Sequence, residues 1–281
     1  MNFENLVAIM KKNIKGLFME VIKKCISNDP YVFDTNVDGI PIFTQKNLKF
    51  LHAIIDNDSN YRNSQDDTDT YFETSYAGLL KKHSITDDPI IMEQIIKSID
   101  KINSTHLSSE GHSGGGNGIQ ITLNRIMKID NLKHKLETKN TDIVVSIARA
   151  VKDTTNKNKI NFSFATKFCA YTSIIALEKD NYCIYDTVVQ NILPYYAYIY
   201  LNDNSYYRTK RTGENCSNIE SQFKQNLDYS GYRNLIDRII DKIEEDIGTR
   251  VSYKDFDNLL WYYFKGTDSR IKKAMSLLPK K

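Results

Sequence analysis

Apolar residues recur at steps of three and four positions along most of this 281-residue chain, a spacing that predicts amphipathic α-helices. The chain has only 12 glycines and five prolines, so few residues interrupt the periodic segments. Asp88 followed by Pro89 is a typical helix start, and Ser252 fits an N-cap. The short apolar run at 40–43 predicts either a strand fragment or an extended segment. We predict an all-α, mainly helical fold, with helices near residues 3–26, 46–57, 89–102, 119–137, 141–153, 165–177, 231–247 and 252–264.

A glycine-rich segment divides the chain into two helical regions. Five of the 12 glycines fall between Gly111 and Gly118. A phosphate-binding loop is disfavoured there, because the Gly-Lys-Ser/Thr ending is absent and no clear strand precedes the segment. We predict instead a flexible connection or lid between an N-terminal helical region, residues 1–118, and a C-terminal region, residues 119–281.

Composition and charge exclude several classes of protein. Hydrophobic residues make up 41% of the chain, which is enough for a real core and excludes wholesale disorder. The net charge of +3 excludes a histone-like protein. Residues 1–150 carry 18 basic and 19 acidic side chains, whereas residues 151–281 carry 20 and 16. This asymmetry mildly favours an anionic partner for the C-terminal half.

The four cysteines are scattered, which argues against a metal centre. Cys25, Cys169, Cys183 and Cys216 form no C-x-x-C pair, so zinc ribbons, zinc fingers and closely ligated iron–sulfur clusters are disfavoured. We expect reduced thiols in a cytoplasmic protein, with no metal and no cofactor. No stretch approaches the roughly 18 apolar residues that a membrane span needs, so we expect no membrane association.

Residues 160–190 contain the most informative side chains. We predict a tight turn at 161–164 that leads into a helix at 165–177, with Lys167 in its first turn. The positive end of the helix dipole disfavours a cation there, which lowers the pKa of the amine and favours nucleophilic amine chemistry. Asp186 follows a short apolar run and begins a second helix as its cap. Taken alone, these two residues are typical of a surface lysine and an ordinary cap.

The order and spacing in this segment resemble the helix-hairpin-helix DNA glycosylase superfamily, most closely the 8-oxoguanine DNA glycosylase type. Asp186 follows Lys167 by 19 residues, as in that family. The match covers about 30 residues and rests on three stretches: Thr166-Lys167, Ala176-Leu177-Glu178-Lys179 and Ile184-Tyr185-Asp186. The resemblance implies two helical subdomains that flank a cleft.

The resemblance also implies a reaction. Lys167 would attack the sugar C1′ as a Schiff-base nucleophile, and the imine would permit β-elimination, an AP-lyase step. Asp186 would orient or deprotonate the nucleophile and stabilise the developing oxocarbenium charge. The substrate would be duplex DNA with a flipped, oxidised purine-like base, or another nucleobase-containing ligand. The family is also encoded beside type IV CBASS antiphage systems, which adds operon partner proteins and a role in bacterial antiviral defence to the expectations.

Further residues are expected to bind the substrate. By the resemblance, the base pocket would be lined by Tyr171, Asp257, Trp261 and Tyr262. The hairpin backbone would bind a DNA phosphate through Ser163, Phe164, Ala165 and Thr166. Independently, the segment 206–211 interleaves tyrosines with Arg208, Lys210 and Arg211, a composition that suits base stacking and phosphate contacts, although a solvated loop fits equally well.

The chain also departs from the family pattern. Ser163 and Ala165 replace the usual glycines of the hairpin, and Val188 stands where well-known members have a phosphate-contacting histidine. These departures favour an alternative, a catalytically impaired glycosylase-fold module that binds nucleic acid or a nucleobase, whereas the retained Lys167 and Asp186 favour the enzyme. A third interpretation is an unrelated all-α interaction protein with a chance match.

Overall fold

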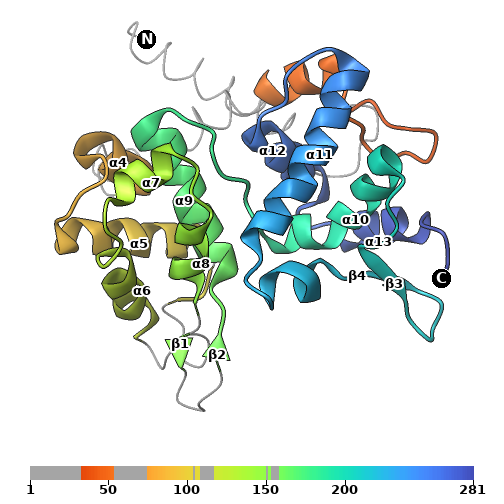
Figure 1. The fold of residues 1–281 in the computed structure, drawn as a ribbon. Coiled ribbons are helices and arrows are strands. Elements are labelled where there is room, and N and C mark those ends of the chain that lie inside the picture. The colour runs from red at the N-terminus through yellow and green to blue at the C-terminus, as the bar shows by residue number, and fades with distance from the viewer. Residues whose placement is uncertain (1–32, 54–74, 104, 108–116, 150, 153–157) are drawn as a thin grey trace, which may run out of the picture.

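The computed structural model describes residues 33–53, 75–103, 105–107, 117–149, 151–152 and 158–281, and this part of the chain is mainly helical, as the periodicity predicts (Figure 1). A helix at 45–53 precedes α4 (Tyr76–His83), α5 (Pro89–Asn103), α6 (Gly118–Ile126), α7 (Leu132–Glu137), α8 (Asp142–Ala148), α9 (Phe162–Leu177), α10 (Thr187–Leu201), α11 (Tyr229–Ile247), α12 (Tyr253–Phe264) and α13 (Asp268–Ser276). A π-helical turn, η1 (Glu220–Lys224), precedes α11. Two small antiparallel sheets pair β1 (Val151–Lys152) with β2 (Asn158–Lys159) and β3 (Tyr207–Thr209) with β4 (Asn215–Ser217).

Several predicted helix starts are confirmed by their caps. α5 begins at Pro89, and the Asp88 carboxylate accepts a hydrogen bond of 2.8 Å from the N–H of Ile90. Ser252 caps α12 in a reciprocal capping box with Asp255. The cap side chains satisfy N–H groups that have no partner within the helix, which explains why these starts are readable from local sequence.

Three predicted boundaries are wrong. The single helix expected at 119–137 is two helices, α6 and α7, separated by a turn in which Asn131 has a left-handed backbone (φ 55°), a conformation that asparagine tolerates. α8 ends at Ala148, and the chain turns into the β1–β2 hairpin instead of remaining helical to 153. α9 begins at Phe162, so residues 162–164 form its first turn and not a separate tight turn.

Other predictions concern residues outside the described part of the chain. The helix predicted at 3–26 and most of the glycine-rich connection lie outside it. Of the helix predicted at 46–57, the structure describes residues 45–53 as helical. The apolar run at 40–43 is mainly extended, with one isolated bridge between Thr35 and Pro41.

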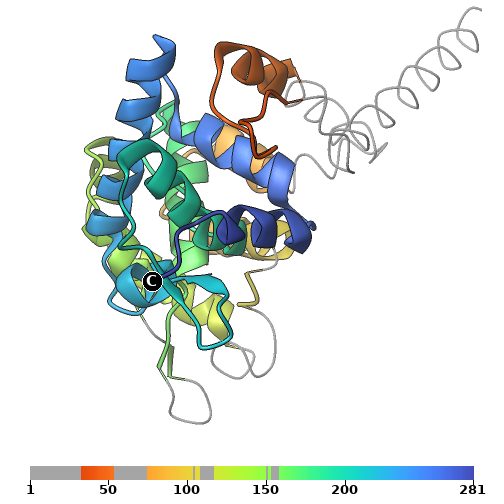
Figure 2. The ribbon, with the colours of Figure 1, turned by 90° about the vertical axis from the view of Figure 1, so that its right-hand side faces the viewer.

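The helices form two groups, visible on the left and right of Figure 1. The first group contains α4 to α9, in which α8 packs against α9 and α4 packs against α5 and α9. The second contains α10 to α13 together with the segment 33–53, which lies beside α12 in Figure 2. Residues 178–186 connect the two groups. The division expected at Gly118 falls between α5 and the rest of α6, but these two helices pack together in the first group. The two packing groups therefore do not coincide with the two regions expected from the sequence.

The segment 33–53 belongs to the core of the second group although it is distant from it in sequence. The ring of Phe43 stacks on Phe256 with centroids 5.3 Å apart and an interplanar angle of 4°. The Tyr196 hydroxyl donates a 2.8 Å hydrogen bond to the carbonyl of Pro41, and the Tyr200 hydroxyl accepts one of 3.0 Å from the N–H of Phe43. These contacts hold the segment against α10 and α12, the helices that carry part of the candidate site.

Within the described residues, no helix is long and apolar enough to cross a lipid bilayer.

Replacing Phe43 with alanine tests this arrangement. Phe43 is 2% exposed, so Phe43→Ala is expected to lower the free energy of unfolding by about 3–5 kcal/mol, as for other aromatic residues removed from well-packed cores. Val37 in the same segment is fully exposed, and Val37→Ala is expected to change it by less than about 0.5 kcal/mol. Urea denaturation followed by circular dichroism measures both variants. Similar, small effects for the two would show that the segment does not belong to the folded core.

Candidate active site

The structure brings Lys167, Asp186 and Asp257 together in one cluster, which is defined here as the buried charge cluster. Lys167 lies in the second turn of α9, Asp186 caps α10, and Asp257 lies on α12. Lys167 and Asp186 are each only 7% exposed. Lysine is rarely buried without a compensating charge, so this location is exceptional for an ordinary surface lysine.

Hydrogen bonds of Thr166 place Lys167 beside Asp186. The hydroxyl of Thr166 accepts a 3.0 Å hydrogen bond from the N–H of Tyr185 and donates one of 3.1 Å to the carbonyl of Ser163. Lys167 directly follows Thr166 in the chain, and Asp186 directly follows Tyr185. The bond between Thr166 and Tyr185 therefore fixes the positions of Lys167 and Asp186 relative to each other across 19 residues of sequence.

The Asp186 carboxylate has a structural partner as well. Its Oδ1 accepts a 2.9 Å hydrogen bond from the N–H of Val189, which confirms the predicted N-cap of α10. Within the described residues, no ion pair of 4.0 Å or less joins Lys167 to a carboxylate. Lys167 and the two aspartates therefore interact through space in a medium of low dielectric constant, where such effects are strong.

Burial dominates the electrostatics of the cluster. Burial lowers the pKa of Lys167, the charges of Asp186 and Asp257 oppose this, and the charge of Lys265 lowers the pKa further. Burial and the charge of Asp186 raise the pKa of Asp257 well above its usual range, against a smaller effect of Lys167. Both shifts are toward the uncharged form of the group, which is the form that burial favours.

The cause of the lowered lysine pKa differs from the one expected. A helix start at 165 would place Lys167 in the first turn, next to the positive end of the helix dipole. Because α9 begins at Phe162, Lys167 is its sixth residue, beyond the range in which the dipole is strongest. The pKa is lowered mainly because the ammonium group loses contact with water.

Aromatic side chains enclose the segment that leads to Asp186. The ring of Tyr185 packs edge-on against Phe162 at 5.0 Å, and its hydroxyl donates to Oε1 of Gln190 at 2.7 Å. The Tyr232 hydroxyl donates to the carbonyl of Ile184 at 2.6 Å. Burial raises the pKa of both tyrosines. The Tyr232 hydroxyl therefore holds the backbone before Asp186, the Tyr185 hydroxyl connects this segment to α10, and both stay protonated at neutral pH.

Three of the predicted base-pocket residues lie on α12, and one of them, Asp257, belongs to the cluster. Oδ1 of Asp257 is buried and has no hydrogen-bond partner among the described residues. Trp261 is half-buried, and Nζ of Lys265 lies 6.0 Å from the centre of its ring. Tyr262 is buried and packs edge-on against Trp261 at 5.2 Å.

Tyr171, the fourth predicted pocket residue, has different neighbours. Its ring stacks on Tyr76 of α4 with centroids 4.9 Å apart, and its hydroxyl donates a 2.8 Å hydrogen bond to Asn103 of α5. The side chain is therefore directed toward α4 and α5, and these contacts connect α9 with those two helices within the first group.

The residues expected to bind DNA phosphate occupy two unlike settings. Ser163, Phe164, Ala165 and Thr166 belong to α9 and not to a hairpin, which corrects the expected geometry. The side chains of Phe164, Ala165 and Thr166 are fully buried, so only backbone groups there could reach a ligand. The side chains of Arg208, Lys210 and Arg211 are exposed on β3 and the turn that follows it.

The tyrosines of the segment 206–211 are engaged within the fold, which corrects the expectation that they stack on a base. Tyr207 is 1% exposed and donates a 2.9 Å hydrogen bond to the carbonyl of Pro279. The ring of Tyr206 stacks on Phe223 with centroids 6.0 Å apart. This segment therefore presents cations to solvent, without the aromatic surface that the sequence pattern indicates.

Asp180 is a site residue that sequence reasoning missed. Burial raises its pKa, and its Oδ2 accepts a 3.1 Å hydrogen bond from the N–H of Lys254 at the start of α12. Its charge also raises the pKa of Asp257. Asp180 thus connects the segment 178–186 to α12, and no local pattern predicts a contact across 74 residues.

The thiols and carboxylates offer no evident metal site within the described residues, where no group of three or more His, Cys, Asp or Glu side chains is placed to hold an ion. Cys169 and Cys183 are free and buried, and burial raises the pKa of Cys183 to about 12.

Comparisons of this chain with protein-family models, with curated proteins and with solved structures give no match.

The role of Thr166 can be measured with two substitutions. Thr166→Val leaves the buried N–H of Tyr185 without a partner and is expected to lower the free energy of unfolding by about 1–3 kcal/mol. Thr166→Ser keeps the hydroxyl and loses only a methyl group, with an expected cost of about 1 kcal/mol or less. Urea denaturation compares them. If valine is tolerated as well as serine, the hydrogen bond does not hold this region together.

The protonation of Asp257 predicts a pH dependence of stability. Above the ordinary value of 3.8 the unfolded chain loses this proton while the folded chain keeps it, so stability falls as pH rises toward the pKa of the folded state. Asp257→Asn removes this effect. Its free energy of unfolding relative to wild type should therefore increase between pH 4 and 7, by up to about 1.4 kcal/mol per pH unit. Urea denaturation across this range provides the measurement. Asp241→Asn, at an exposed position on α11, serves as the control and should show no such trend; an equally flat result for Asp257→Asn would contradict the assignment.

Proposed function

We propose that this chain is a DNA glycosylase with AP-lyase activity, related in fold to the helix-hairpin-helix glycosylases. It acts on duplex DNA from which a modified, oxidised purine-like base is flipped out. The observation that carries the proposal is the burial of Lys167 beside Asp186 and Asp257, three residues from three separate elements. A lowered pKa increases the fraction of a lysine that is present as the unprotonated, nucleophilic amine, and an adjacent carboxylate can accept its proton.

In the proposed reaction, the unprotonated Nζ of Lys167 attacks C1′ of the sugar. The N-glycosidic bond breaks, and the base leaves with the bonding electrons and takes up a proton. Opening of the sugar ring and loss of the remaining amine proton leave a Schiff base between Nζ and C1′. Removal of a proton from C2′ then eliminates the 3′ phosphate, and water releases Lys167 by hydrolysis. Asp186 accepts the amine proton and stabilises the positive charge that develops on the sugar.

Asp257 has a distinct part in this proposal. A neutral carboxylic acid can donate a hydrogen bond, whereas a carboxylate can only accept one. Its buried, unpartnered Oδ1 is one polar group that a flipped base could satisfy. The proposal therefore assigns Asp257 to recognition of the base, next to the half-buried ring of Trp261.

The order of elements supports the proposed relationship. α8, a hairpin and α9 come in sequence, and an aspartate-capped helix follows, as expected for the family from the matched residues. The two groups of helices on either side of residues 178–186 correspond to two subdomains (Figure 1). The hairpin departs from the family pattern, because β1 and β2 extend it and no glycine precedes Lys167 within α9.

Borohydride trapping tests the proposal. Wild-type protein is incubated with sodium borohydride and duplexes that carry either an abasic site or one of a panel of oxidised purines. Reduction of the Schiff base should yield a covalent protein–DNA adduct, visible as a shifted band on a denaturing gel. Lys167→Gln should abolish the adduct. The matched control is Lys179→Gln, an exposed lysine 12 residues further on, which should trap as wild type does.

Two results would overturn the assignment. Equal trapping by Lys167→Gln and wild type would mean that another amine is the nucleophile. Absence of an adduct and of base release on every duplex, with DNA still bound, would support the alternative of a binding module that retains the fold of a glycosylase. In that case the buried charge cluster would recognise a nucleobase without cleaving its bond to the sugar.

A further inference from the structure

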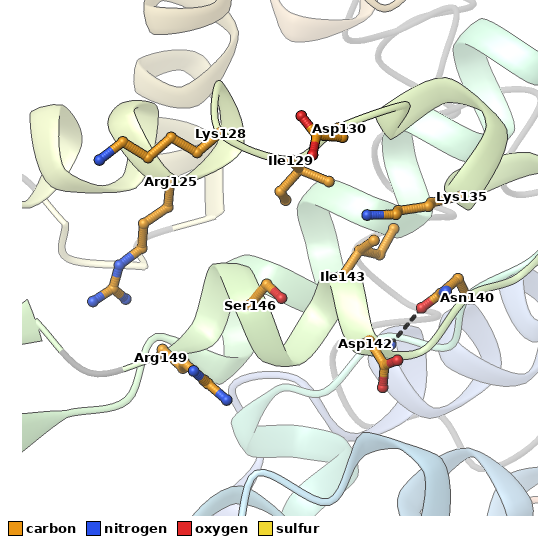
Figure 3. Close-up of a pocket in the computed structure, with 10 residues that line it drawn as sticks. All are labelled: Arg125, Lys128, Ile129, Asp130, Lys135, Asn140, Asp142, Ile143, Ser146 and Arg149. Atoms are coloured by element: carbon orange, nitrogen blue, oxygen red, sulfur yellow. Dashed lines mark hydrogen bonds between the residues drawn. The ribbon is translucent and has the colours of Figure 1, made fainter.

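A second candidate site lies on the first group of helices, away from the buried charge cluster. It is a shallow hollow of about 520 Å³ between α6, α7 and α8 (Figure 3). Four cations line it, Arg125, Lys128, Lys135 and Arg149, together with the carboxylates of Asp130 and Asp142. We call this hollow the basic groove. None of its ten lining residues belongs to the buried charge cluster.

The lining indicates what kind of ligand the groove suits. Pockets for small organic molecules are lined mostly by apolar side chains. Here only Ile129 and Ile143 of the ten lining residues are apolar. Cations exceed carboxylates by two, so the groove favours a hydrated anion over an apolar ligand.

Three of the cations lack compensation. Among the described residues, no carboxylate lies within 4.0 Å of the charged groups of Lys128, Lys135 or Arg149. Figure 3 shows Arg125 and Arg149 at the same end of the groove, while Lys135 extends toward it from α7. Burial lowers the pKa of Arg125, and the charge of Arg149 lowers it further, so the two guanidinium groups repel each other.

The groove is fixed to the segments that carry the active-site residues. Ala148, next to Arg149, accepts a 3.0 Å hydrogen bond from the N–H of Asn161, the residue before α9. Lys167 is six residues further on, about 9 Å along the helix axis. At the other end of the groove, Tyr182 makes a similar connection, four residues before Asp186. Its hydroxyl lies 3.0 Å from the carbonyl of Lys135 and 3.2 Å from that of Asn140.

We propose that the basic groove binds phosphate groups along a nucleic-acid strand, a choice of ligand that rests on the proposed function. A strand with a nucleotide at Lys167 that runs past the start of α9 toward Arg149 would bring several phosphates to the groove, because charges along one strand are spaced about 3.4 Å apart along the axis of the duplex. Lysines and arginines there would replace the counterions of those phosphates. This contact supplies affinity that does not depend on the identity of the base.

The test compares two triple variants that remove equal charge. The groove variant is Lys128→Gln, Lys135→Gln and Arg149→Gln. The control variant is Lys133→Gln, Lys179→Gln and Lys272→Gln, three exposed lysines outside the groove. Fluorescence anisotropy measures binding of a labelled duplex that carries a non-cleavable abasic-site analogue, between 50 and 200 mM NaCl (roughly the range over which phosphate contacts change affinity steeply).

The groove variant is expected to bind at least about tenfold more weakly at 100 mM NaCl, and the slope of log K against log salt should lose about 0.9 for each phosphate contact removed. The control variant should match wild type. Equal losses in both variants, or no DNA binding by wild type, would overturn the proposal. If the groove triple variant does not fold, as judged by circular dichroism, the double variant Lys128→Gln and Arg149→Gln, both at exposed positions, answers the same question.

Two further measurements separate the possible outcomes. Inorganic pyrophosphate is added in a thermal-unfolding assay; if it stabilises wild type but not the groove variant while DNA binding is equal, the groove takes small free phosphates and not a strand. Borohydride trapping separates this proposal from the proposed function. If DNA binding requires the groove but no adduct is trapped, the glycosylase proposal is overturned and the groove proposal stands. If an adduct is trapped and the groove variant binds DNA as wild type does, the groove proposal is overturned and the glycosylase proposal stands.

Discussion

The arrangement of this protein depends on how the buried charge of Lys167 is balanced. An ammonium group taken out of water costs several kcal/mol unless other charges compensate for it. The acidic side chains that lie near it, Asp186 at the cap of α10 and Asp257 on α12, both belong to the second group of helices. The environment of Lys167 therefore depends on the packing of the two groups against each other. The hydrogen bond between Thr166 and Tyr185 connects α9 to the segment that leads into α10.

The parts of the site that follow from local sequence were the ones predicted. Asp186 and Ser252 satisfy helix N–H groups within three residues of themselves, so their caps are visible in the chain. The sequence did not predict that α9 begins as early as Phe162. Phe162 and Phe164 are fully buried, and their packing holds residues 162–164 in the helix. In a hairpin that contains glycines, these residues would lie before the helix. The neighbours of Tyr171 and Tyr207 depend on contacts across 68 and 72 residues, which no local pattern encodes.

The nearly neutral composition has a different meaning once charges are located. A net charge of +3 would give little general attraction to a polyanion. The structure shows that cations without a carboxylate partner gather locally in the described residues, at Lys128, Lys135 and Arg149, although the first 150 residues carry a net charge of −1. The difference in net charge between the two halves of the sequence is therefore a weaker guide to anion-binding surfaces than the positions of individual cations and their ion pairs.

The two proposed sites would divide the physical tasks between them. The buried charge cluster is suited to chemistry more than to attracting a polyanion, because burial favours the uncharged forms of Lys167 and Asp257. The basic groove has the opposite properties, because its lining includes exposed cations and is screened by salt. If the groove supplies affinity for phosphate, as proposed, the cluster needs no exposed charge to bind the strand and can stay buried, and burial is what lowers the pKa of Lys167.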